Sequence, residues 1–104
     1  MAVKAINVRE DFTRFPAGRY ISDGSYSGQR FRDEFLVPAL NSSDLVEIYL
    51  DGTLSPGSSF LEEAFGGLLR VGFHSDALAG QLKIISSDEA LVSEVLQYLG
   101  ISVH

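Results

Sequence analysis

The chain has 104 residues, of which 45% are apolar and 21% charged, values typical of one soluble globular domain spanning residues 1–104. Eight basic against fourteen acidic residues give a net charge of −6. This balance argues against non-specific nucleic-acid binding and against binding to anionic membranes, because both need a basic face. With no cysteine in the chain, disulfides, zinc–thiolate sites and cysteine nucleophiles are excluded.

The N-terminal region is expected to contain two strands. Residues 3–8 predict the first strand. The segment Phe15–Gly18 predicts a turn, because proline suits its second position and glycine closes it. Residues 19–21 then predict a short second strand, which Asp23 and Gly24 end. No signal-peptide pattern and no apolar run near ~20 residues occurs, which predicts a cytoplasmic location.

A first helix is expected to open at Ser27 and Gly28. Its apolar stripe is formed by Phe31, Phe35, Leu36 and Leu40. Pro38 lacks the backbone N–H of a regular helical residue, so it predicts a kink or an early end. Residues 41–44 are expected to form a loop.

Residues 45–50 give the clearest strand. Val46, Ile48 and Leu50 are expected to share one face of the sheet, since side chains alternate along a strand. Asp51 and Gly52 end it, and a loop follows.

Residues 59–71 give the clearest helix. Ser59 and Glu62 match a capping box, with serine as the N-cap and glutamate at the third helical position. The apolar stripe consists of Phe60, Leu61, Ala64, Phe65, Leu68 and Leu69. Gly66 and Gly67 lie inside this helix, which favours the close approach of another backbone.

The C-terminal part predicts a strand over residues 81–85 and a final helix. Ser86 and Glu89 match a second capping box, and Gly100 is a natural helix stop. The helical stripe contains Leu91, Val92, Val95, Leu96 and Leu99.

The predicted order is β-β-α-β-α-β-α. Strands that alternate with helices favour parallel pairing, and three helices most simply cover one face of so small a sheet. We therefore expect an α/β sandwich with a four-stranded, mostly parallel sheet and three helices.

This order and three segments resemble the STAS-like domain family of unknown function, which is related to the STAS domains of anti-sigma-factor antagonists. The resemblance covers nearly the whole chain, and its most specific segment is Ser58–Leu68. The other segments are Gly18-Arg19-Tyr20 with Asp23-Gly24 and Ser27-Gly28, and the strand that ends in Asp51-Gly52.

In anti-sigma-factor antagonists, a partner kinase with a GHKL-type ATPase fold phosphorylates a serine at the start of a helix. The resemblance carries this role to Ser58 or Ser59, although Gly57 precedes them where the usual motif has an aspartate. It implies a non-enzymatic regulatory module that binds such a kinase or an anti-sigma-like regulator. The implied partner-binding residues are Asp51, Gly52, Glu62, Glu63 and Phe65.

Both serines also have a purely structural interpretation. A serine at a helix start satisfies a free backbone N–H, and the capping box already accounts for Ser59. Ser58 is therefore the favoured regulatory site. A phosphate there would be stabilised by the helix dipole and would add roughly −1.5 to −2 charges.

A second hypothesis is a small-anion or nucleotide sensor at the loop Gly24–Gly28. A Gly/Ser loop that opens a helix can hold phosphate with its backbone N–H groups, but no complete phosphate-binding motif is present. The alternative is a tight turn stabilised by its own side chains. The candidate residues are Arg19, Asp23, Gly24, Ser25, Ser27, Gly28 and Arg30.

Charge is unevenly distributed along the chain. Residues 1–32 carry a net +3 and residues 33–104 a net −9, which could steer a charged partner if the fold separates them. No nucleophile–base pair or metal-binding spacing is present, since the histidines are His74 and His104, so we expect no enzyme, metal or cofactor. A homodimeric structural subunit is a third hypothesis.

Overall fold

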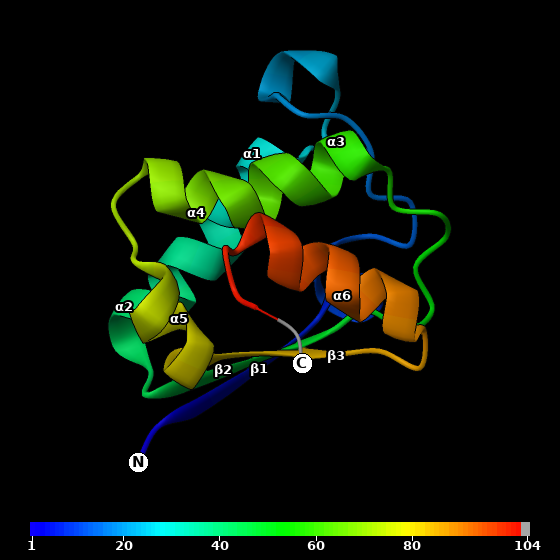
Figure 1. Ribbon diagram of the computed structural model, residues 1–104. Coiled ribbons are helices and arrows are strands. Elements are labelled where there is room, and N and C mark those ends of the chain that lie inside the picture. Colours follow the sequence, from blue (N-terminus) through cyan, green and yellow to red (C-terminus); the bar gives the residue numbers. More distant parts are fainter. Residues whose placement is uncertain (103–104) are drawn as a thin grey trace.

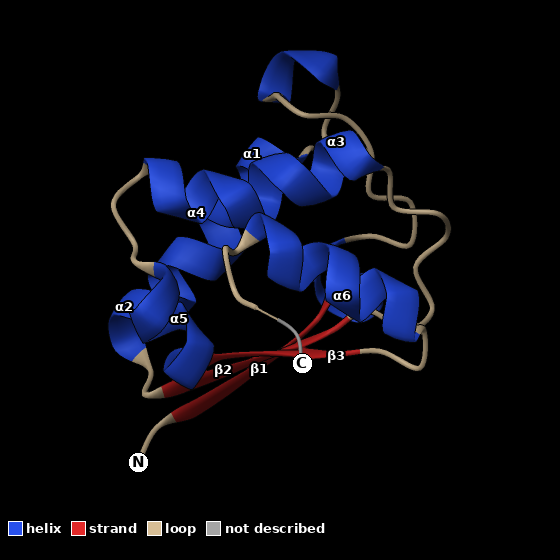
Figure 2. Ribbon diagram, viewed as in Figure 1, coloured by secondary structure: helices blue, strands red, loops and turns tan. Residues whose placement is uncertain are grey.

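The computed structural model describes residues 1–102 and places the helices on one side of a small sheet (Figures 1 and 2). The strands are β1 (Val3–Asn7), β2 (Leu45–Tyr49) and β3 (Leu82–Ile85). They are parallel, in the order β1-β2-β3. The predicted α/β architecture with helices on one face is therefore confirmed, but the described chain has three strands rather than the expected four.

The missing strand is the one expected over residues 19–21, where the chain forms the 3₁₀ turn η2 (Ile21–Asp23). The backbone N–H groups of Arg19 and Tyr20 donate to the Asp23 carboxylate at 3.2 and 2.9 Å. The N–H of Ile21 donates to Gln29 Oε1 at 3.0 Å. Because side chains already satisfy these donors, the segment has none left for a sheet ladder.

Two long helices cross above the sheet, and each contains a wider π-helical turn. The first runs through α1 (Gly28–Phe31), η3 (Arg32–Leu36) and α2 (Val37–Ser42). The second runs through α3 (Ser58–Leu61), η4 (Glu62–Gly66) and α4 (Gly67–Arg70). A third π-helical turn, η1 (Val8–Phe12), directly follows β1.

The first helix does not end at Pro38, so the expected early end is wrong. Pro38 lies in the first turn of α2, directly after η3. The N–H of Val37 donates to the carbonyl of Arg32, five residues back, instead of four. The hydrogen-bond register therefore changes just before the proline, and the helix continues to Ser42.

The C-terminal region contains one helix more than expected. This helix is α5 (Ser75–Gln81), and only Leu78 in it is buried, so it presents no apolar stripe for a sequence pattern to detect. The last helix, α6 (Glu89–Tyr98), is capped by Asp88, which accepts from the N–H of Leu91 at 3.2 Å. Ser86 is therefore not the N-cap, because its hydroxyl donates to Asp51 at 3.0 Å instead.

The hydrophobic core lies between the sheet and the two long helices. Val46 and Ile48 on the helix side of β2, and Leu50 just after the strand, are almost fully buried, as the alternation predicted. They meet Phe31 and Leu36 from the first helix, and buried residues of the second helix that include Phe60, Leu61, Phe65 and Leu68. Gly100, at φ 72°, follows α6 and confirms the predicted stop. In the described part of the chain, no helix has the length and apolar character needed to cross a membrane.

Candidate functional site

The second long helix begins at an exposed turn without a side-chain cap. Its N-cap is Gly57, and the carbonyl of Gly57 accepts from the N–H of Leu61 at 3.1 Å. Ser58 and Ser59 are the first two helical residues and both are exposed. The predicted capping box of Ser59 and Glu62 is therefore wrong. Both hydroxyls and the first-turn N–H groups are left without a side-chain partner in the described chain.

Glu62 does not cap the helix start, because its carboxylate pairs with two arginines instead, Arg70 of the same helix and Arg19 of the N-terminal loop. Arg70 Nη1 lies 2.7 Å from Glu62 Oε2, and Arg19 Nη1 donates to Glu62 Oε1. The hydrogen bond from Arg70, followed by that from Arg19, lowers the pKa of Glu62 from 4.5 to about 2. Glu62 is therefore a paired anion, and its charge adds little repulsion to a group at the helix start.

The neighbouring residue Glu63 forms a buried ion pair that joins the two long helices. Glu63 and Arg32 expose only 6% and 8% of their surfaces, and the Arg32 guanidinium donates to the Glu63 carboxylate. Arg32 also donates to the backbone carbonyl of Glu63 at 3.2 Å and to Asp33 at 2.9 Å. The pair lies where the two π-helical turns face each other. The pair stabilises the contact between these turns, because removing one partner would leave the charge of the other buried without its main counter-charge.

Glycines make room for this junction, although not in the way the sequence suggested. A Cβ at Gly67 would clash with the guanidinium of Arg32, and one at Gly66 would lie 2.5 Å from Glu62 Oε2. Side chains, rather than the expected second backbone, therefore occupy the space beside Gly66 and Gly67. The close backbone approach occurs at Gly28, where a Cβ would clash with the carbonyl of Phe60.

The expected partner-binding residues fall into two groups. Asp51 and Gly52 are exposed in the turn after β2. Phe65 is fully buried in the core, and Glu63 is buried in its ion pair. The assignment of these two side chains as partner contacts is therefore contradicted by their burial. Glu62 is partly exposed but already engaged by arginines.

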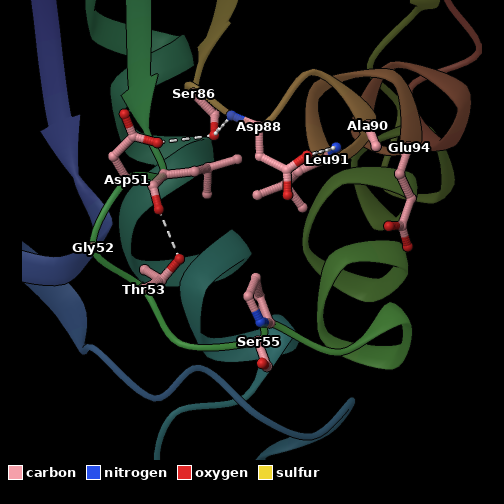
Figure 3. A pocket seen from close by; sticks show the side chains of 11 residues that line it. Asp51, Gly52, Thr53, Ser55, Ser86, Asp88, Ala90, Leu91 and Glu94 are labelled. Atoms are coloured by element: carbon pink, nitrogen blue, oxygen red, sulfur yellow. Dashed lines mark hydrogen bonds between the residues drawn. The ribbon is translucent and has the colours of Figure 1, made fainter.

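A pocket of about 390 Å³ lies at the carboxyl ends of β2 and β3 (Figure 3). The Asp51 carboxylate accepts from the Ser87 N–H at 2.9 Å and from the Ser86 hydroxyl at 3.0 Å. These donors, the Ser87 N–H first, lower the pKa of Asp51. Asp88 and Glu94 border the pocket from α6. Three carboxylates at one opening suit hydroxyl or cationic donors and repel an anion.

The loop proposed as an anion site uses its polar groups internally. The N–H of Gly28 donates to the Gly18 carbonyl at 3.0 Å, and buried Ser27 caps α1 by accepting from the N–H of Arg30. Arg30 donates to the Ser25 carbonyl at 2.6 Å. Arg19 donates to Glu62, as described above. The structure thus brings the candidate residues together in a turn whose backbone and arginine groups are bonded internally, and a Cβ at Gly24 would meet nothing within 4 Å.

Ion pairs join part of the basic N-terminal region to the acidic remainder of the chain. Arg19, Arg30 and Arg32, from the basic N-terminal part, pair with Glu62, Glu34 and Glu63 from the acidic remainder. No group of three or more His, Asp or Glu residues within 1–102 could hold a metal ion. His74 is exposed, and His104 lies outside the described residues.

Sequence reasoning missed the roles of Arg32 and Arg70. The available signal was Glu63, a charged residue in the middle of the apolar stripe of the second helix, three and four positions before Gly66 and Gly67. A buried carboxylate there requires a cationic partner. The link from Asp51 to Ser86 and Ser87 was also missed, because it joins loops 35 residues apart.

Residues 27–91 match the model of the family described as STAS-like domain of unknown function (DUF4325). Neither the search of curated proteins nor that of solved structures found a significant match. The matched segment begins at the cap of α1 and reaches into α6, so it contains β2, β3, Ser58 and Ser59, and the Arg32–Glu63 pair. It covers well over half of the chain. The chain therefore belongs to the STAS-like domain family of unknown function.

Proposed function

We propose that this domain is a non-enzymatic regulatory module that binds a protein partner and is switched by phosphorylation at the start of the second long helix. The observation that carries the proposal is the uncapped helix start at Gly57, followed by two exposed serines. The free N–H groups there can donate hydrogen bonds to a phosphate, which the helix dipole favours. We propose a GHKL-type ATPase as the kinase.

Ser58 is proposed as the main site of phosphorylation. On a helix, a residue shares its face with those three and four positions ahead. Ser59 therefore faces both Glu62 and Glu63, whereas Ser58 faces only Glu62. Both carboxylates are paired with arginines. The remaining electrostatic repulsion comes from one carboxylate for a phosphate on Ser58 and from two for a phosphate on Ser59.

Exposed apolar side chains next to this helix start support a protein partner. Phe15 and Leu54 expose 61% and 59% of their surfaces. Their loops are joined, because the N–H of Leu54 donates to the Arg14 carbonyl at 2.7 Å. Adjacent apolar groups beside a modifiable serine form a surface on which a charge of about −2 would change binding. We propose that the partner contacts this surface together with Asp51 and Gly52, and that this takes place in the cytoplasm.

The test compares tagged wild-type protein with Ser58→Ala and Ser58→Glu, each expressed in its native cells and recovered by affinity capture. Mass spectrometry then identifies both the bound proteins and any phosphoserine. Ser25→Glu is the matched control, since Ser25 is also an exposed serine close to the start of a helix.

We expect phosphate on Ser58 of the wild type, and a partner whose recovery changes about tenfold in Ser58→Glu but not in Ser25→Glu. A tenfold change corresponds to about 1.4 kcal/mol. The absence of phosphate from both Ser58 and Ser59, with the same bound proteins for every variant, would refute the switch. Stabilisation by added phosphate or nucleotide would instead support the anion-sensor alternative.

A further inference from the structure

Arg19 reaches the second long helix from the loop that precedes α1. Its Nη1 donates to Glu62 Oε1 and also to Glu63 Oε1, the latter at 3.3 Å. The Arg19 side chain is 32% exposed, so its guanidinium lies near the surface of the domain. These contacts hold a positive charge beside the helix face that carries both glutamates.

Arg19 is a redundant partner of both carboxylates. Without it, Glu62 keeps two hydrogen bonds from Arg70, at 2.7 and 3.1 Å. Glu63 keeps its buried pair with Arg32. The Arg19 side chain can therefore leave this cluster without stranding either carboxylate, whereas Arg32 is buried in its own pair.

The backbone of Arg19 is held by the part of the first helix that packs on the start of the second. The Arg19 carbonyl accepts from the N–H of Gln29 at 3.0 Å. The residue before Gln29 is Gly28, where a Cβ would clash with the carbonyl of Phe60. Phe60 directly follows Ser59. The arginine backbone therefore stays near the first turn of the second helix while its side chain changes partner.

Ser59 shares its helix face with the two glutamates that Arg19 binds. It precedes Glu62 by three positions and Glu63 by four, and residues at these spacings have Cβ atoms about 5–6 Å apart. Ser58 precedes Glu62 by four positions and does not share a face with Glu63. A phosphate on Ser59 therefore lies about one helical turn from both residues whose carboxylates Arg19 binds.

We infer that Arg19 binds the phosphate when Ser59 is phosphorylated, whereas a phosphate on Ser58 stays open to a partner. A phosphate with about two negative charges attracts a guanidinium more strongly than a single carboxylate does, and it accepts two parallel hydrogen bonds from it. Phosphate on Ser59 then ties the N-terminal loop to the helix start. The inference rests on the proposed function, because it concerns the same two serines.

The test places phosphoserine at position 59 or 58 during synthesis of the full chain and follows each phosphate by phosphorus NMR across a pH titration. The second pKa of phosphoserine is about 6, and a bound guanidinium lowers it because a cation favours the dianion. Arg19→Gln should therefore raise the pKa of a phosphate on Ser59 by about 0.5, a roughly threefold change in its dissociation constant. For a phosphate on Ser58, we expect a change below about 0.2.

The phosphate on Ser58 is the matched control, because both phosphoproteins carry the same substitution and a general change in structure would affect them alike. Arg19→Lys keeps the charge but loses the paired donors, so its pKa should fall between those of the wild type and Arg19→Gln. An equal rise at both positions, or no rise at position 59, would overturn the inference. Since synthesis supplies the phosphate, the result is separate from whether cells phosphorylate either serine, which the affinity capture tests.

Discussion

The two long helices begin in opposite ways. The first starts from Ser27, which is fully buried and accepts from the N–H of Arg30, and Gly28 then packs against the backbone of Phe60. The second starts from exposed Gly57, with no side-chain cap and nothing within 4 Å of a Cβ placed there. The first start is thus part of the packing between the helices, whereas the second is free for a partner or a modifying enzyme.

The same contrast recurs within the second helix. Its first turn is exposed, but its middle turn carries Glu63 in a buried pair with Arg32. We therefore expect fold stability to depend on the middle of this helix more than on its start. Substitutions at the two places should therefore differ in their effect on the free energy of unfolding.

The largest effect is expected at the buried pair. Glu63→Ala leaves the Arg32 guanidinium buried with Asp33 as its only carboxylate partner, beside the backbone carbonyl of residue 63. The loss should cost about 3 kcal/mol of the free energy of unfolding. Denaturant titration measures this loss. Glu34→Ala, which removes an exposed partner of Arg30, should cost about 0.5 kcal/mol or less. A loss below about 1 kcal/mol for Glu63→Ala would show that the pair does not lock the helices.

The next effect distinguishes the two helix starts through their glycines. Gly28→Ala forces a Cβ against the Phe60 carbonyl and should cost about 1–3 kcal/mol. Gly57→Ser places a preferred N-cap residue where there is room for its side chain. It should stabilise the protein by roughly a few tenths of a kcal/mol. Thermal unfolding of both variants reports the opposite signs. Equal losses at the two positions would contradict the difference between the helix starts.

A smaller effect distinguishes the serines. Ser27→Ala removes a real cap and should cost about 1 kcal/mol. Ser58→Ala removes an exposed hydroxyl with no partner in the described chain, so stability should change by less than about 0.5 kcal/mol. Denaturant midpoints compare the two. A large loss for Ser58→Ala would mean that the hydroxyl supports the fold.

The smallest effect is a pH dependence at Glu62. Its pKa is lowered from 4.5 to about 2 by Arg70 and Arg19. The stabilisation from this shift is fully present above pH 4.5 and is lost as the pH falls through about 2. Unfolding measured between these pH values should show a shallower loss for Glu62→Gln than for the wild type. Parallel profiles for the two proteins would rule out the carboxylate as the titrating group.

Local sequence patterns were sufficient where an element buries its own apolar face. The alternation of Val46, Ile48 and Leu50 placed β2 and its inner face correctly. Gly100 marked the end of α6, because glycine adopts positive φ readily. The family was also evident from the sequence, as Ser58–Leu68 is a continuous stretch that lies within the matched residues.

Local patterns failed where a distant residue competed for the same group. Ser59 and Glu62 have the spacing of a capping box, but Arg19 and Arg70 bind the glutamate. Ser86 and Glu89 have the same spacing, but Asp51 binds the serine. Residues 19–21 suit a strand, yet Asp23 and Gln29 accept from their N–H groups.

The sequence alone therefore determined the fold class, the inner face of β2 and the position of two serines at a helix start, because these follow from periodicity and from neighbours in the chain. The tertiary structure decided which helix start is buried and where the ions pair. These features depend on contacts between segments far apart in sequence, as between Arg32 and Glu63. A charged group pairs with the partner that packing brings within reach, and spacing along the chain cannot specify that partner.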